Sequence, residues 1–238
     1  MCRPDPGSMN NTFLTREQIY RNTKNWYKKL NKPVTNKDNI DFVKKYAGQN
    51  ILDVGCATGG YCLELNKQGF KCVGIDVNAD YVKIAKENGV EAYLIREEFP
   101  FKDKTFDTVI MFELIEHVVE PDKILKEAKR VAKKSILISV PNCGGTETLG
   151  NYGLTYEHFL EMDHKNFFTK DSLTVLLSKH FDNFKIIEVG PIYPLLLNYK
   201  GVLGKIIGLP LRKFVTLFYK LGILRSDFYR GLQAVVIL

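Results

Sequence analysis

The fold of this chain is decided by residues 50–59, which read Asn-Ile-Leu-Asp-Val-Gly-Cys-Ala-Thr-Gly. The first half is a short apolar run of the kind found in a buried parallel strand. Gly55 and Gly59 then allow a sharp turn and a close approach to a ligand, which a Cβ would obstruct. A helix-compatible stretch follows, Tyr61 to Gln68, whose first free amides face the ligand. The segment therefore predicts a strand, a ligand-binding turn and a helix.

A second strand, Lys71 to Ile75, ends at Asp76, where a carboxylate is suited to accept both hydroxyls of a ribose. The glycines of the turn do not have the G-x-G-x-x-G spacing of dinucleotide-binding proteins. Asp53 lies inside the turn, where its charge would repel a pyrophosphate but attract the ammonium group of an amino acid. These features predict a nucleoside ligand and disfavour NAD.

In these two segments the sequence resembles the class I S-adenosylmethionine-dependent methyltransferases. The resemblance continues along the chain: Phe106 to Glu113 is similar to the fourth strand of that family, and Glu116-His117-Val118 to the segment after it. Pro121 to Asn142 is similar to the next helix and the fifth strand. The resemblance covers about 50–190. It implies an α/β fold with a doubly wound, mostly parallel seven-stranded sheet flanked by helices, in the order 3-2-1-4-5-7-6 with the last strand antiparallel.

The residue pattern predicts the same alternation of strands and helices. Two helices are expected first, at 15–30 and 37–47, and another runs from Thr169 to His180. Strands are expected at about 50–55, 71–76, 91–95, 106–112, 135–140, 184–190 and 232–238. We interpret residues 1–9 as a remnant of cloning, 10–48 as a helical lid and 49–238 as the cofactor-binding domain, with an insert at 191–230.

The resemblance implies S-adenosylmethionine as the cofactor, bound at the carboxyl ends of the strands. Asp53, Gly55 and Gly59 would hold its methionine end, Asp76 the ribose and Val77 the adenine. After the third strand the family usually has an Asp that contacts the adenine. Here the segment reads Ile95-Arg96-Glu97-Glu98, so Glu97 is the candidate and backbone amides are the alternative. The expected cofactor contacts are Asp53, Gly55, Cys56, Gly59, Asp76, Val77, Glu97 and Phe112.

A second group of residues carries acid–base chemistry: Glu113-x-x-Glu116-His117, with Asp163-His164 farther along. If the chain is helical after the fourth strand, the first three share one face. They could bind a divalent cation, accept a substrate proton, or orient one another. The pattern is similar to the metal-binding set of small-RNA 2′-O-methyltransferases and to segments of quinone O-methyltransferases. We favour a metal-free site with Glu113, His117 and His164 as catalytic residues; a metal set of Glu113, Glu116, His117 and His164 is the alternative.

The segment from Leu195 to Arg230 contains seven basic residues against Asp227 alone, interleaved with many apolar ones. This pattern predicts an amphipathic helix that lies on an anionic membrane surface or roofs an acceptor pocket. An ordinary helix packed on the domain is the simpler alternative. A nucleic-acid partner is disfavoured, because no aromatic stacking platform accompanies the charges.

The five cysteines have no metal-binding spacing and indicate reduced thiols. With no signal peptide and no apolar run of about 20 residues, they favour a cytoplasmic protein, with peripheral membrane contact through the insert. The predicted function is methyl transfer from S-adenosylmethionine to a small or lipid-like acceptor, with oxygen favoured as the methylated atom. The alternatives are an RNA-end methyltransferase with a Glu/His metal site and a catalytically idle nucleoside-binding scaffold protein.

Overall fold

The computed structural model describes residues 35–96, 98–146, 149, 159, 161, 163–192, 214, 217–218, 221–223 and 228–238. The predicted helix at 15–30, the adenine candidate Glu97 and most of the insert at 191–230 lie outside these residues.

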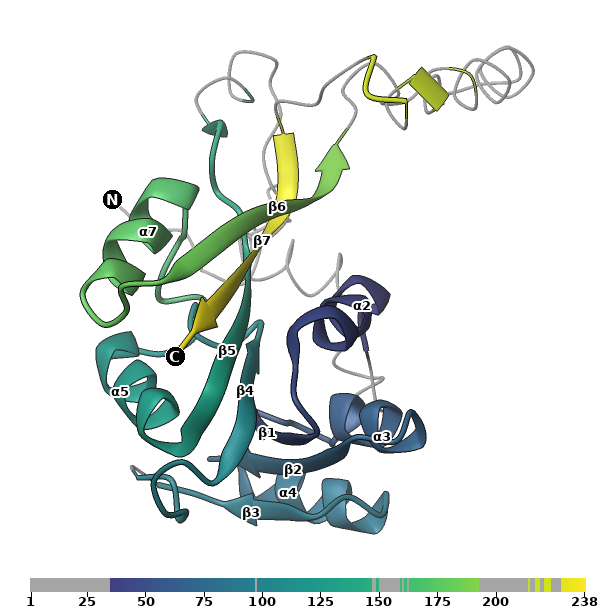
Figure 1. The fold of residues 1–238 in the computed structure, drawn as a ribbon, viewed down its shortest axis with the longest axis vertical. Helices are drawn as coiled ribbons and strands as arrows, with labels where there is room; N and C mark the ends of the chain where they lie inside the picture. Colours follow the sequence, from purple (N-terminus) through teal and green to yellow (C-terminus); the bar gives the residue numbers. More distant parts are fainter. Residues whose placement is uncertain are drawn as a thin grey trace, which may run out of the picture.

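One sheet of seven strands forms the centre of the described structure, in the order β3-β2-β1-β4-β5-β7-β6 (Figure 1). Neighbours among the first five strands pair in parallel, whereas β7 is antiparallel to both β5 and β6. The predicted strand order and the antiparallel last strand are therefore confirmed. The strands are β1 Asn50–Val54, β2 Lys71–Asp76, β3 Ala92–Leu94, β4 Phe106–Phe112, β5 Ala132–Pro141, β6 Phe184–Ile192 and β7 Phe228–Ile237.

The strand ends agree closely with the prediction for β2 and β4 and less well for β5 and β7. β5 begins at Ala132, three residues before the predicted start, because Ala132 pairs with Phe106 ahead of an irregularity in the register. β7 begins at Phe228, which pairs with Ile192 of β6. Lys133 and Lys134 in β5, and Arg230 and Gly231 in β7, separate these first pairs from the apolar part of each strand, so the hydrophobicity pattern did not predict them.

Helices cover both faces of the sheet. One face packs against α2 (Lys37–Tyr46), α3 (Gly60–Lys67) and α4 (Ala79–Glu87), and the other against α5 (Pro121–Val131) and α7 (Lys170–Ser178). Each face has its own buried apolar cluster, as a doubly wound sheet requires. Among the described helices, none is both long and apolar enough to cross a bilayer.

Helix α2 begins at a cap that places a polar residue in the core. The side chain of Asn36 accepts a hydrogen bond from the backbone N–H of Asp38 at 2.9 Å. One turn along the helix, Asn39 is 2% exposed and lies against the sheet. The cap therefore fixes the helix phase that buries Asn39.

Candidate functional site: the cofactor loop and an acid–imidazole cluster

The loop after β1 is held against β2 by its own backbone. The N–H groups of Gly55 and Cys56 both donate to the carbonyl of Ile75, at 2.8 and 3.0 Å. Gly55 has φ +74°, and a Cβ there would lie 2.7 Å from Cδ1 of Leu114. The N–H groups of Gly55 and Cys56 are therefore engaged within the protein. Gly55 is required by backbone conformation and by the packing of Leu114.

Asp76 ends β2 with its carboxylate fixed on both sides. One oxygen accepts from the N–H of Ala57 at 2.9 Å and the other from the N–H of Asn78 at 2.8 Å. A carboxylate oxygen has a second lone pair, so each can still accept a ribose hydroxyl. The next residue, Val77, is 69% exposed and offers an apolar surface beside the carboxylate. The arrangement fits the ribose and adenine of S-adenosylmethionine.

Asp53 is a buried carboxyl beneath the loop, with Sγ of Cys62 3.7 Å from its Oδ2. Burial raises the pKa of Asp53 to about 7, and the nearby charge of Asp76 acts in the same direction. A cationic ligand would lower this pKa again, because it favours the ionised carboxylate. Asp53 therefore fits the ammonium group at the methionine end of the cofactor.

Two further predicted cofactor contacts border the loop. Phe112 is buried and packs edge-on against Tyr61, with ring centroids 5.1 Å apart. Cys56 is also buried, which raises the pKa of its thiol far above the ordinary range. A thiol so protected from ionisation is a poor nucleophile, so the side chain acts here as a small packing residue.

The chain after β4 forms a turn, and the conditional expectation of a helix there is wrong. Glu113 has φ +51°, and the N–H of His117 donates to the carbonyl of Leu114 at 2.9 Å, which closes a tight turn. Glu113 is thereby separated from Glu116 and His117. Its side chain accepts from Oγ of Ser139 at 2.8 Å instead.

Backbone hydrogen bonds bring His164 to the same turn. The N–H groups of Lys165 and Asn166 both donate to the carbonyl of Glu116, at 2.7 and 2.9 Å. The side-chain amide of Asn166 also donates to the carbonyls of Ile115 and Val118. Asn166 was not predicted from the sequence, since no nearby motif indicates its long-range partners.

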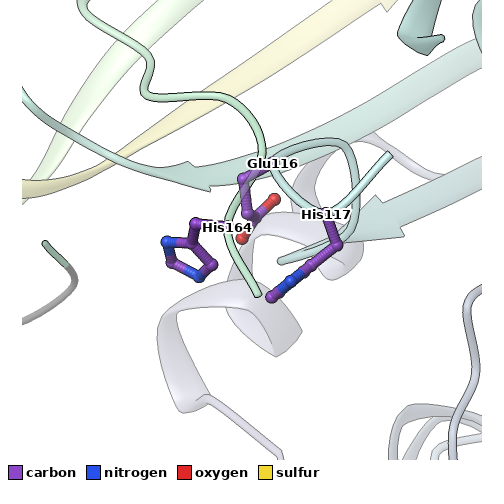
Figure 2. Close-up of side chains that lie close together, drawn as sticks. All are labelled: Glu116, His117 and His164. Carbon is purple, nitrogen blue, oxygen red and sulfur yellow. The ribbon is translucent and has the colours of Figure 1, made fainter. Parts of the chain in front are cut away.

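The resulting acid–imidazole cluster consists of Glu116, His117 and His164 (Figure 2). Their donor atoms all lie within 4.8 Å of one another, and the two imidazole rings have centroids 4.6 Å apart. Each imidazole also has a carboxylate neighbour: Asp163 lies 3.5 Å from His117 Nδ1, and Glu161 lies 3.2 Å from His164 Nε2. Three of the four residues of the predicted metal set are thus together, without Glu113.

The electrostatics of the cluster favour proton acceptance. Glu116 is 1% exposed, and neither carboxylate oxygen has a hydrogen-bond partner among the described residues. Burial, followed by the charge of Glu113, raises the pKa of Glu116 well above its ordinary value. Burial lowers the pKa of His117, although Asp163 opposes this shift. His117 is therefore neutral at pH 7 and can accept a proton.

A pocket of about 650 Å³ lies beside the cluster. It is lined by Glu113, which follows β4, and by Glu161, which lies before His164 in the chain. Its other lining residues come from α2, β5, β6 and β7: Asn36, Asp38, Asn39, Ser139, Val140, Pro141, Val189, Gly190, Pro191, Arg230, Gly231 and Leu232. Glu161 lines the pocket and also pairs with His164, so this residue connects the pocket to the cluster.

Three polar residues under this pocket were missed by sequence reasoning. Gln233 donates to Oδ1 of Asn39 at 2.9 Å, and Nδ2 of Asn39 donates to Oγ of Ser139 at 3.1 Å. All three are at least 96% buried. A usable signal was present, because Ser139 and Gln233 interrupt the apolar runs at 136–140 and 232–236, and buried polar groups require partners.

The sequence profile of the methyltransferase domain family matches residues 28–189. A norajmaline N-methyltransferase of Rauvolfia serpentina is 40% identical over 94 residues, in an alignment that covers 35% of this chain and 32% of that protein. A ubiquinone biosynthesis O-methyltransferase of Hahella chejuensis is 30% identical over 105 residues, 40% of this chain and 44% of that protein. The chain thus spans less than half the length of these curated relatives.

Solved structures share the whole fold. A SAM-dependent methyltransferase from Archaeoglobus fulgidus superposes with a TM-score of 0.59 at 19% identity, over 94% of this chain and 95% of that one. One from Aquifex aeolicus gives a TM-score of 0.52 at 17% identity, over 94% and 99%. The solved structures show that the fold is that of SAM-dependent methyltransferases, and the profile match over most of its length places the chain in the methyltransferase domain family, which implies S-adenosylmethionine as the cofactor.

Proposed function

We propose that this chain transfers the methyl group of S-adenosylmethionine to a hydroxyl of a small-molecule acceptor bound in the pocket beside Glu113. The observation that carries the proposal is the pair of imidazoles, His117 and His164, which is linked to that pocket through Glu161: Glu161 lines the pocket and lies 3.2 Å from His164. Burial lowers the pKa of His117. A hydroxyl nucleophile must lose a proton as it attacks, and a neutral imidazole is suited to take it.

The residues have distinct proposed roles. S-adenosylmethionine supplies an already activated methyl group, so the protein's task is to position the acceptor and remove its proton. Asp53, Asp76 and the loop at 55–59 hold the cofactor. His117 and His164 accept the proton, and Asp163 and Glu161 orient the two rings through the contacts described above. Among the curated relatives both O- and N-methyltransferases occur, which supports a small-molecule acceptor.

Metal-assisted methylation is the second candidate, favoured by one observation. Glu116 has two buried oxygens without partners, and two imidazoles lie within reach of the same point. One carboxylate and two imidazoles suit a divalent first-row metal. A bound cation would polarise the acceptor hydroxyl and stabilise the ionised Glu116. In this candidate Glu116, His117 and His164 hold the ion.

One pair of measurements separates the two candidates. We expect the rate of S-adenosylhomocysteine formation to be unchanged by EDTA and to fall about 10²–10⁴-fold in His117→Ala or His164→Ala. Because the pKa of His117 is lowered, activity should persist below pH 6.5 and fall only in more acidic buffer. Loss of activity in EDTA with recovery in Mg²⁺ or Mn²⁺ would instead establish the metal-assisted reaction. His180→Ala is the control, since His180 pairs with Asp122 outside the site.

We also propose that the insert at 191–230 controls access of the acceptor and adds affinity for anionic membrane surfaces. Four of its described apolar side chains are largely exposed: Phe214, Leu217, Leu221 and Ile223. Phe214 and Phe218 pack edge to face, with centroids 4.7 Å apart. Exposed apolar residues in a basic segment are typical of a surface that contacts lipid.

A further inference from the structure

We propose that the acceptor carries a protonated amine, and that Glu113 binds this cation at the floor of the pocket. The inference rests on the proposed function, in which the pocket is the acceptor site. It adds the chemical class of the acceptor and assigns Asn39, Ser139 and Gln233 as positioning residues.

The first support is the way in which Glu113 is held. Its N–H donates to the carbonyl of Ser139 at 2.9 Å, while its carboxylate accepts from Oγ of the same residue at 2.8 Å. Glu113 has φ +51°, a left-handed conformation that is uncommon for residues other than glycine. Such strain is maintained only where the surroundings hold it, and it is concentrated at functional sites. The two bonds to Ser139 fix the carboxylate at the pocket.

The second support is the direction of the hydrogen bonds behind Glu113. Because Gln233 donates to the side-chain oxygen of Asn39, the amide group of Asn39 is free to donate to Oγ of Ser139. The hydroxyl of Ser139 must then donate onward to Glu113, which favours the ionised carboxylate. The buried residues thus prepare a negative charge at the pocket before any acceptor binds.

The third support is the charge of the lining. Three acidic residues, Asp38, Glu113 and Glu161, line the pocket, whereas Arg230 is the single basic residue among its described lining residues. The buried Glu116, whose carboxylate has no hydrogen-bond partner among the residues that the structure describes, is also affected by the charges of Glu113 and Glu161. An anionic acceptor would be repelled by this arrangement, and a neutral one would gain nothing from it. A cationic acceptor is attracted.

Three probes of similar size and the same phenol group test the inference: tyramine, 4-ethylphenol and 3-(4-hydroxyphenyl)propionate. Calorimetry would measure their binding to the full chain saturated with S-adenosylhomocysteine. We expect tyramine to bind about tenfold to a hundredfold more tightly than 4-ethylphenol, with the propionate weakest. Equal binding of the three, or no binding of tyramine to cofactor-loaded protein, would overturn the inference.

Variants locate the effect. Glu113→Gln keeps the acceptor for the Ser139 hydroxyl but removes the charge, so the preference for tyramine should vanish. Ser139→Ala keeps the charge of Glu113 but removes the hydrogen bond from the Ser139 hydroxyl that holds the carboxylate in place, so the preference should shrink without vanishing. Asp171→Asn, an exposed carboxylate on α7, is the control and should keep the full preference. A preference that survives in Glu113→Gln would refute the assignment. Failure of S-adenosylhomocysteine itself to bind would count against the proposed function instead.

Discussion

Replacing Asp53 by asparagine should stabilise the cofactor-free protein, and more so as the pH rises. Asp53 is buried beside Cys62, and burial raises its pKa from the ordinary value of 3.8 to about 7. Since the folded pKa is above the unfolded one, ionisation favours the unfolded chain. The penalty is absent well below pH 3.8, grows between the two pKa values and is complete above pH 7.

The magnitude follows from the size of the shift. The rise in the pKa of Asp53 from 3.8 to about 7 means that folding disfavours the ionised carboxylate, relative to the protonated carboxyl, by about 4 kcal/mol. At pH 4.5 the penalty is about 1 kcal/mol, and at pH 8 it approaches about 4 kcal/mol. The asparagine variant escapes it, so the free energy of unfolding of Asp53→Asn relative to the parent should rise by about 3 kcal/mol between these pH values.

Urea unfolding at pH 4.5 and pH 8, without cofactor, measures this difference. Asp107→Asn is the control, because the N–H of Asn50 and the ammonium of Lys134 lower the pKa of Asp107 below its ordinary value of 3.8. The stability that the Asp107 carboxylate adds is present above the unfolded pKa and lost only as the pH falls below it, so the difference for Asp107→Asn should be nearly the same at pH 4.5 and pH 8. A difference for Asp53→Asn that is the same at both pH values would refute the buried-carboxyl argument. Bound S-adenosylhomocysteine should reverse the preference, because its ammonium favours the ionised Asp53.

Three further outcomes are expected. Asp76→Asn should weaken binding of S-adenosylhomocysteine roughly tenfold to a hundredfold in calorimetry, because one oxygen that faces the ribose is replaced by an N–H group; unchanged affinity in a folded variant would disprove the ribose contact. Gly55→Val should lower Tm, because overpacking against Leu114 should reduce the free energy of unfolding by about 1–3 kcal/mol. Gly69→Val is its control, since Gly69 also has a positive φ but has open space around it; equal losses would show that strain alone is responsible. Changing Lys205, Arg212, Lys213 and Lys220 together to Gln should reduce co-sedimentation with anionic vesicles at low salt, by about 1 kcal/mol for each charge near the surface, without altering cofactor affinity. If the parent ignores such vesicles, the membrane proposal fails.

The local residue pattern was sufficient to predict approximately where the strands of the sheet lie in the sequence. The apolar run at 51–54, its glycine turn and the acidic end of the next strand are features of neighbouring residues, so a single sequence displays them. The strand order then followed from resemblance to a family. Strand ends at Ala132 and Phe228 were missed because long-range pairing, and not hydrophobicity, extends β5 and β7.

The site was predicted only in part, for a related reason. His117 and His164 were expected to act together, and the structure brings their rings within 4.6 Å. Glu113 was expected on the face of a helix, yet a turn with positive φ directs it to Ser139. Asn39 and Gln233 are 194 residues apart, and only the folded chain shows that they share a hydrogen bond beneath the pocket.

Parallel calorimetric titrations with S-adenosylhomocysteine and NAD test the central claim most directly. The turn at 55–59 lacks the third glycine of a dinucleotide site, and Asp53 lies where a pyrophosphate would be repelled. We therefore expect saturable, one-to-one binding of S-adenosylhomocysteine and no measurable heat with NAD. Binding of NAD, or the absence of S-adenosylhomocysteine binding to folded protein, would contradict the assignment of this chain as a methyltransferase.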